Sequence, residues 1–259
     1  MGTVVLSCSH ILVGGYEFSG DFNEWMVNHA SGQLDRTTFG TLTRLHKSGL
    51  FTPAIEAKGF VNLGSSLLDP VLFSNVGGPG VLVSIFRHGI TEGSTNDGFG
   101  MQAQQAQYNW GGNVGDLLPF DFAAESDSAL VMAVPIWDAR ATAWSTDSSG
   151  GTVYPISTAG WSTGEQLYAG LHVTAMSTGI LLTSVAVIIQ QASSSGAGFT
   201  AAATNRITFS TYSCSKASEF AVPIGTHSTD KPFWRAKVTV STGASTGANA
   251  NGLVFVSMK

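Results

Sequence analysis

Residues 181–190 read LLTSVAVIIQ, and this stretch decides the fold class. Four of its last six residues are β-branched, namely Val185, Val187, Ile188 and Ile189. Branched side chains are stiff about χ1 and pack well on a pleated sheet. A short apolar run of this kind, bounded by polar residues, predicts a buried strand.

The same signal recurs on both sides of this stretch. Residues 168–175 and 233–240 alternate apolar and polar side chains, as strands with one buried face do. Clusters of glycine, serine, threonine and asparagine separate the strands, at 193–198 and 241–251, and predict loops. The sequence therefore predicts an all-β protein.

One helix is expected, over residues 67–75, which read LLDPVLFSN. The Asp69 carboxylate can accept from the free N–H groups of a first turn, and Pro70 has the backbone angle that the first helical position needs. A helix of about two turns is stable only when it packs on something larger. We expect its apolar residues to pack on a sheet, and these are Val71, Leu72 and Phe73.

The composition excludes several classes of protein. The 259 residues include 12 Lys and Arg against 17 Asp and Glu, and only 11% are charged, compared with about 25% in an average domain. The 43% of hydrophobic residues suffices for a core, so disorder is not expected. A net charge of -5 disfavours a basic nucleic-acid binder. The longest apolar run is about ten residues, against the ~20 of a membrane-spanning helix.

A domain boundary is indicated by the polar, glycine-rich stretch at 144–151, which has strand patterns on both sides. We predict a first β module over 1–140, a linker or loop over 141–165 and a second β module over 166–259. A single sandwich with one long loop is the alternative.

The two cysteines, Cys8 and Cys214, form no disulfide framework and are expected to be free thiols. Whether they lie near each other does not follow from the sequence. The first residues carry no basic, apolar secretion signal. We therefore expect a protein that folds in the cytoplasm of the cell that makes it.

No metal site is expected. The histidines show no HxH or HExxH spacing, and the cysteines no CxxC spacing, that would indicate zinc. They are scattered along the chain as His10, His29, His46, His88, His172 and His227. Residues 95–98, TNDG, lack the spaced acidic ligands of a calcium loop and predict a turn.

Candidate catalytic and cofactor patterns are equally weak. Residues 196–201 form a G-x-G-x-x-A pattern, but a strand-like run follows where a dinucleotide site needs a helix, so a hairpin loop is expected. Residues 227–230, HSTD, hold a base, a hydroxyl and an acid, but neighbours in a loop point apart. An acidic loop on the surface explains Asp121, Glu125 and Asp127. We expect no enzyme, no cofactor and no catalytic residue.

The surface composition favours self-association. Few charges give little self-repulsion. Residues 101–110, MQAQQAQYNW, place amides where they could pair with a neighbouring subunit, although an edge strand facing water is an equal alternative. The loops at 89–100 and 241–251 are expected to act as docking arms between copies.

Several residue strings between 10 and 130 resemble tail tube proteins of long-tailed bacteriophages. They are SGDFN at 19–23, LDRTTFG at 34–40, SGL at 48–50, GFV at 59–61, the LDP helix start at 68–70 and NVGDLLPF at 113–120. The second half is similar to β-sandwich modules appended to phage virion proteins, at NRITF (205–209) and FWRAKV (233–238).

The resemblance implies a structural virion protein of the phage tail, made in the cytoplasm of the host bacterium. Its fold would be a β-sandwich or barrel with one short flanking helix and an extended hairpin or loop, followed by a second β-sandwich. Copies would form hexameric rings that stack into the tail tube and contact other phage proteins. DNA would pass through without specific binding, and no membrane would be involved. The second module exceeds what a ring needs and would decorate the exterior.

Two other roles remain open. A decoration or cement protein of the phage head would share the β content and the low charge. A carbohydrate-binding module would use exposed aromatic side chains to stack on sugars, and the candidates are Trp161, Tyr168 and Trp234. Aromatic residues in strands are more often part of the core.

Overall fold

The computed structural model describes most of the chain, and it divides into two compact units. The described residues are 9–38, 43–63, 68–87, 89–90, 92, 98–140, 144, 154–155, 166–176, 182–193, 204–213, 215–222, 233–242 and 250–258. The first unit comprises residues 1–19, 81–101 and 131–259, and the second comprises 20–80 and 102–130. Both are built from β-strands, so the predicted all-β class is confirmed.

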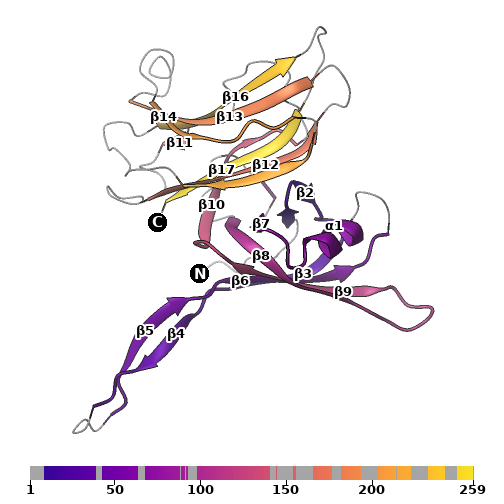
Figure 1. Cartoon of the computed structure of the whole chain (residues 1–259), viewed down its shortest axis with the longest axis vertical. Coiled ribbons are helices and arrows are strands. Elements are labelled where there is room, and N and C mark those ends of the chain that lie inside the picture. The colour runs from indigo at the N-terminus through magenta and orange to yellow at the C-terminus, as the bar shows by residue number, and fades with distance from the viewer. Residues whose placement is uncertain are drawn as a thin grey trace. The chain divides into compact units, whose positions relative to one another are not determined.

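Two sheets make up the first unit (Figure 1). The larger has the order β15-β12-β17-β10-β8-β7-β1-β2 and the smaller the order β11-β16-β13-β14. The strands of the unit are β1 (His10–Val13), β2 (Tyr16–Glu17), β7 (Val81–Phe86), the start of β8 (Gly98–Trp110), β10 (Val131–Asp138), β11 (Tyr154–Pro155), β12 (Leu167–Met176), β13 (Leu182–Ala192), β14 (Thr204–Thr208), β15 (Ala217–Ala221), β16 (Phe233–Thr242) and β17 (Ala250–Met258).

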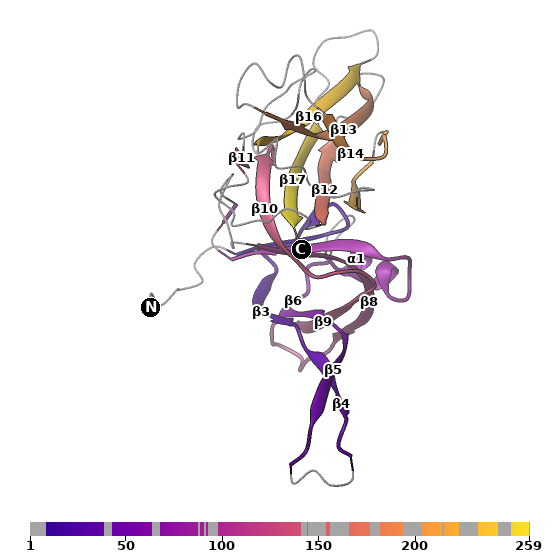
Figure 2. The ribbon, with the colours of Figure 1, turned by 90° about the vertical axis from the view of Figure 1, so that its left-hand side faces the viewer.

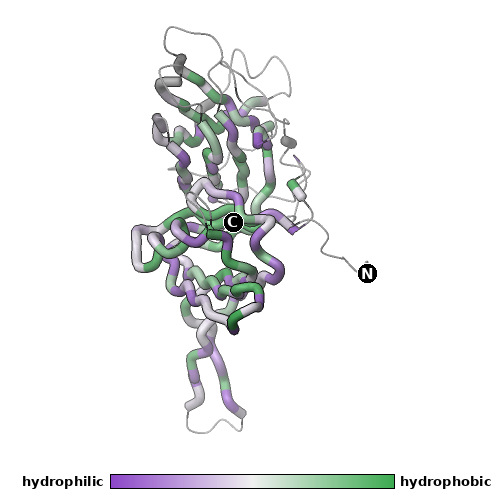
Figure 3. The backbone as a smooth tube through the Cα atoms, turned by 90° about the vertical axis from the view of Figure 1, so that its right-hand side faces the viewer, coloured by the Kyte–Doolittle hydropathy of each residue, from purple (hydrophilic) through white to green (hydrophobic). Residues whose placement is uncertain are grey.

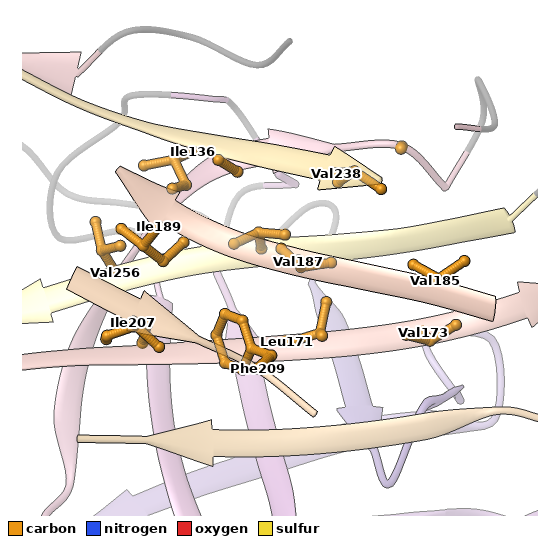
Figure 4. Packing of buried hydrophobic residues seen from close by; sticks show 14 of the residues in the cluster. Ile136, Leu171, Val173, Val185, Val187, Ile189, Ile207, Phe209, Val238 and Val256 are labelled. Carbon is orange, nitrogen blue, oxygen red and sulfur yellow. The ribbon is translucent and has the colours of Figure 1, made fainter. Parts of the chain in front are cut away.

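The core of the first unit lies between the β12–β17–β10 strands and the smaller sheet, as in a β-sandwich (Figure 4). The strands predicted at 181–190, 168–175 and 233–240 are present as β13, β12 and β16. In β16 the buried side chains alternate with half-buried Arg235, Lys237 and Thr239, as predicted. The sandwich predicted for the C-terminal part is therefore observed.

One position in the larger sheet requires glycine. The ring of Phe255 on β17 lies where the Cβ atom of any other residue at Gly170 would be. Gly170 pairs with Phe255 across β12 and β17. The absence of a side chain at Gly170 therefore lets the Phe255 ring lie over β12.

The second unit is an antiparallel sheet with the strand order β3-β6-β9-β8, one helix and a separate two-stranded hairpin. Its elements are β3 (Phe22–Asn28), β4 (Ser31–Asp35), β5 (His46–Phe51), β6 (Ala54–Phe60), α1 (Leu68–Asn75), β9 (Pro119–Ser126) and the larger part of β8. α1 is the one α-helix in the described part of the chain.

The predicted helix is present as α1, but it begins at Leu68, so that Asp69 lies inside it, and the Asp69 carboxylate accepts the hydroxyl hydrogen of Tyr108 at 2.9 Å. Its buried residues are Leu68 and Leu72, four positions apart on one face. Phe73 was expected to pack on the sheet, but it is 70% exposed. A two-turn helix can bury a single narrow stripe, and Phe73 lies outside it.

The predicted modules differ from the observed units. The predicted first module, 1–140, is divided between both units, because β1, β2, β7 and the start of β8 continue the sheet from β10, which pairs with β17 of the C-terminal part. The predicted second module, 166–259, lies wholly in the first unit. Of the predicted linker 141–165, the structure describes residues 144, 154 and 155, and Trp144 is buried in the core. Each unit is built from separate stretches of the chain, whereas the prediction assigned one continuous stretch to each module.

Both cysteines lie outside the described residues, as do residues 91 and 93–97 of the predicted loop at 89–100 and residues 243–249 of the predicted loop at 241–251. The segment 89–100 was predicted to be a loop that docks on another copy. Its last residues, 98–100, instead begin β8, and Gly98 and Gly100 are buried there. No described helix has the length and apolar character that crossing a membrane requires.

Candidate assembly surface

The most exposed element of the second unit is the hairpin formed by β4 and β5, here called the arm (residues 31–51). It continues outward from β3 and β6 and extends away from their sheet (Figures 1 and 2). The Thr52 backbone N–H donates to the Ala30 carbonyl at 3.1 Å, which closes the base of the arm. Arg36 N–H donates to the Leu45 carbonyl at 2.7 Å, which extends the pairing beyond β4 and β5.

Cross-strand pairing gives the arm two different faces. Leu34 pairs with Lys47, and Arg36 lies opposite Leu45, so these four side chains share one face. Both leucines are exposed, Leu34 at 58%. This basic–apolar face is the feature that distinguishes the arm from an ordinary polar hairpin, and Figure 3 shows hydrophobic and hydrophilic residues mixed along it.

The base of the arm is apolar as well. Leu50 is 87% exposed and Phe51 58% exposed, and the Phe51 ring stacks on His29 with ring centres 5.2 Å apart. Arg36, Arg44 and Lys47 are all exposed, and within the described residues none of them makes an ion pair. The arm thus presents apolar and cationic groups that its own unit does not cover.

A second surface lies on the outer face of the sheet β3–β6–β9. Ile55, Ala57, Phe122 and Ala124 point inward and are buried, whereas the alternate residues point outward. The outward residues line a hollow of about 470 Å³ and include Glu24, Met26, Glu56, Lys58, Asp121 and Glu125. We call this surface the outer hollow.

The outer hollow is rich in acidic side chains, and apolar side chains, among them Trp25, Met26 and Phe122, also line it. It holds four carboxylates and the Lys58 ammonium group, which pairs with Glu24 at 3.8 Å. Glu56 pairs with Ala123 on β9, so Asp121 and Glu125 are its two diagonal neighbours, at a spacing of about 7–8 Å. Met26, opposite Glu56, is half exposed. Asp121 lies directly opposite Lys58, whereas Glu56 and Glu125 have no cation opposite them, and none of the three carboxylates forms an ion pair in the described structure.

A polar cluster in the first unit was not predicted. Arg140 binds Asp138 through Nε at 2.8 Å and Nη2 at 2.9 Å, and its Nη1 lies 2.6 Å from Glu17 Oε1. His10 Nδ1 lies 2.6 Å from the same Glu17 oxygen. Burial alone would raise the pKa of Glu17, but the hydrogen bond to His10 and the charge of Arg140 lower it from 4.5 to about 2.

This cluster contains an acid, a histidine and a hydroxyl, but its geometry does not fit a catalytic relay. Ser19 Oγ lies 3.3 Å from His10 Nδ1, the same ring nitrogen that Glu17 contacts. A relay needs the acid on one ring nitrogen and the nucleophile on the other. Ser19 Oγ also accepts from the Ile11 backbone N–H at 3.2 Å, so it ties the segment after β2 to β1.

The predicted catalytic candidates are not brought together in the described structure. Asp121 and Glu125 share the outer hollow, while Asp127 lies beyond the end of β9. The patterns at 196–201, 227–230 and 95–97 lie outside the described residues, as do His88 and Trp161. Within the described ranges, no group of three or more potential ligands could hold a metal ion.

Two aromatic candidates for sugar stacking lie elsewhere than expected. Trp234 is fully buried in the sandwich core, because β16 turns that face inward. Tyr168 is half-buried and stacks on Phe220 at 5.7 Å. Trp234 is therefore part of the core, and the alternative that it is exposed and could stack on a sugar is wrong.

The glutamine-rich stretch at 101–110 forms most of β8, as predicted, but its glutamines differ in role. Gln105 is buried, and its Nε2 donates to the Leu72 carbonyl of α1 at 2.8 Å. Tyr108 donates its hydroxyl hydrogen to Asp69 at 2.9 Å. One side of β8 therefore anchors the helix instead of a neighbouring subunit, whereas Gln104 and Gln107 are exposed.

Comparison with known proteins gives weak structural similarities. No protein-family model matches the sequence, and no curated protein matches it either. A chain from the tail of an empty gene transfer agent particle, determined with C6 symmetry, is similar at a TM-score of 0.35 and 10% identity, over 43% of this chain and 81% of that one. The SPP1 Dit protein, described as a hub of the adsorption apparatus in phages that infect Gram-positive bacteria, is similar at a TM-score of 0.37 and 10% identity, over 98% and 100%.

A third similarity is to a chain of the phage p2 baseplate in its activated conformation, at a TM-score of 0.32 and 8% identity, over 96% of this chain and 98% of that one. These TM-scores lie below the level at which a shared fold would define a function for this chain.

Proposed function

We propose that this chain is a structural protein of a bacteriophage tail that assembles with copies of itself into stacked rings around the channel through which DNA passes. The residue strings between 10 and 130 resemble those of tail tube proteins, and that resemblance supplies the six-fold symmetry of the rings. The solved structures named above also come from tails or tailed particles, but their TM-scores are too low to carry the proposal.

The observation that carries the proposal is the uncovered arm. An isolated two-stranded hairpin is marginally stable in water, since it has no third strand or core to support it. Burying a large apolar side chain contributes about 1.5–3 kcal/mol, and Leu34, Leu50 and Phe51 are each more than half exposed. Contact with another copy would bury them and hold the arm in one conformation.

A structural role also fits the chemistry of the first unit. The Arg140–Glu17–His10 cluster uses its charges to hold β1, β2 and the segment after β10 together. We therefore propose that the chain is not an enzyme and uses no cofactor. The excess of 17 acidic over 12 basic residues would let DNA pass without being held, because phosphate binding depends on Lys and Arg.

The rest of the proposed role follows the resemblance. The protein would be located in the tail of the virion after synthesis in the cytoplasm of the host bacterium, and it would contact other phage proteins. The C-terminal sandwich would decorate the exterior of the tube.

Removing the arm tests the proposal. Residues 31–51 are replaced by Asn-Gly, a two-residue turn that suits the close approach of Ala30 and Thr52. We expect the native chain to form rings in negative-stain electron microscopy and the variant to remain monomeric, with a β-rich circular dichroism spectrum reduced only by the loss of β4 and β5. Rings formed equally well without the arm would overturn its role in assembly.

A milder pair of variants controls for surface hydrophobicity. Leu50→Ser/Phe51→Ser removes exposed apolar groups from the arm, and Val114→Ser/Leu117→Ser removes two exposed apolar groups elsewhere in the second unit. We expect at least a tenfold higher concentration for half-assembly in the first variant and less than a twofold change in the second. Equal effects of the two variants would show that the apolar groups of the arm contribute no more to assembly than other exposed apolar groups.

A further inference from the structure

The arm and the outer hollow are both uncovered in the second unit, and their chemistry is complementary. One face of the arm carries Arg36 and Lys47 between Leu34 and Leu45. The outer hollow carries Glu56, Asp121 and Glu125 beside the exposed Met26. We propose that the basic–apolar face of the arm of one copy docks in the outer hollow of a second copy. This proposal rests on the self-assembly proposed above and names the surfaces that make the contact.

The balance of charge supports this pairing. The hollow has four carboxylates and one ammonium group, and that ammonium group is already paired with Glu24. The arm has Arg36, Arg44 and Lys47 against Asp35. Asp121 has Lys58 opposite it, but neither Glu56 nor Glu125 has a cation opposite it on the neighbouring strands, so these two carboxylates favour a cationic partner. Arg36 and Lys47 on the arm of a second copy would be that cationic partner.

The apolar groups support the same pairing. Leu34 and Leu45 lie on the arm face beside the cations, and Met26 lies opposite Glu56 in the hollow. Methionine is flexible and adapts to the shape of a partner. Contact between these side chains would exclude water from around the ion pairs, which strengthens them.

The arm is placed to reach a second copy instead of its own hollow. β4 follows β3 and β5 precedes β6, and β3 and β6 pair directly up to Asn28 and Ala54. The arm therefore extends beyond the edge of the sheet whose outer face forms the hollow (Figure 2). To reach the hollow of its own copy, the arm would have to bend back at its base. That bend would break the hydrogen bond between the Thr52 N–H and the Ala30 carbonyl.

Charge exchange tests the proposed contact. Arg36→Glu/Lys47→Glu and Glu56→Lys/Glu125→Lys are made separately and then combined in one chain, and the concentration for half-assembly is measured by sedimentation velocity. We expect each reversal alone to raise that concentration at least tenfold. The combined variant should return to within about threefold of the native value, because every copy then carries both exchanged surfaces.

Matched variants control for net charge. Arg36→Gln/Lys47→Gln and Gln33→Glu/Ser48→Glu both change the charge of the arm by -2, but Gln33 and Ser48 lie on its other face. Glu56→Gln/Glu125→Gln and Asp116→Lys both change the charge by +2, and Asp116 is exposed outside the hollow. In each pair we expect the first variant to weaken assembly and the second to leave it within twofold of native.

The outcomes separate the two proposals. If the native chain assembles but the combined variant is no better than the single reversals, the docking contact is wrong and the assembly function stands. If Glu56→Lys/Glu125→Lys assembles normally and gains affinity for duplex DNA, the hollow faces the channel and the docking contact is again wrong. If the native chain does not self-associate at any concentration, both proposals fail.

Discussion

Arg140 Nη1 lies 2.6 Å from Glu17 Oε1, although the two residues are 123 positions apart in the chain. The pair joins β2 to the segment that follows β10. The Arg140 side chain is largely buried, and Asp138 binds it from the other side. The N-terminal strands of the first unit are thus fixed by a charge network as well as by sheet hydrogen bonds.

Arg140→Met should lower the free energy of unfolding by about 1–3 kcal/mol, because it leaves Glu17 and Asp138 without their cation in a partly buried site. Chemical denaturation followed by circular dichroism measures this. Lys58→Met is the control, since it breaks the exposed Lys58–Glu24 pair and should cost less than about 1 kcal/mol. A larger loss in the control than in Arg140→Met would contradict the assigned role.

His172 makes stability depend on pH in a defined window. Burial, and then the charge of Arg140, lowers the pKa of His172 from 6.5 to about 3. The unfolded chain therefore binds one more proton between pH 6.5 and 3, and this residue's contribution to stability is lost as the pH falls through that window. The slope from this group is about 1.4 kcal/mol for each pH unit.

Comparing the native chain with His172→Gln isolates this effect. Between pH 6.5 and 4.5 the difference in unfolding free energy between the two proteins should shrink as the pH falls, since glutamine does not titrate. Glu17, whose pKa is lowered to about 2, is present in both proteins, so the stability that it loses below pH 4.5 cancels in this difference. A pH-independent difference between the two proteins would show that His172 titrates normally.

Gly170→Ala should destabilise the first unit by about 1–3 kcal/mol, because the new Cβ atom meets the ring of Phe255. Thermal unfolding monitored by calorimetry is a suitable measurement. Gly111→Ala provides the comparison, since an added Cβ atom there meets nothing within 4 Å. If both variants melt at the native temperature, Phe255 does not occupy the space over Gly170.

Gln105→Leu should cost about 1–3 kcal/mol, because it removes the donor to the buried Leu72 carbonyl near the end of α1. Gln104→Leu changes the exposed neighbouring glutamine and should stay within about 0.5 kcal/mol of native. Hydrogen exchange of the α1 amides is expected to speed up in the first variant alone. Unchanged protection of α1 in Gln105→Leu would mean that the helix is held by its apolar contacts.

Local patterns predict the parts of this fold in which one face of an element is buried along its whole length. β12, β13 and β16 show this as alternation or as a β-branched run, and α1 shows it through the Asp69-Pro70 pair in its first turn. The exposure of Phe73 was not predictable, since neighbouring Leu72 and Phe73 are equally apolar and a two-turn helix fixes no clear stripe.

Features that depend on distant residues left no local signal. Glu17, Asp138 and Arg140 are single charges in unrelated segments, and the chain's return to the first unit after residue 130 depends on sheet pairing. Two of the strings that resemble tail tube proteins, at 34–40 and 48–50, lie within the arm, but the loops at 89–100 and 241–251 were predicted as the docking elements. The sequence signal for the arm is the repeated spacing of a leucine two residues before a basic residue, at Leu34 and Arg36 and at Leu45 and Lys47.

Negative-stain electron microscopy of the purified native chain across a concentration series measures self-assembly most directly. We expect rings with a central hole that stack into tubes as the concentration rises. Discrete monomers or small oligomers without a hole, at every concentration, would contradict the proposed tail function and would favour a test of binding to empty phage heads.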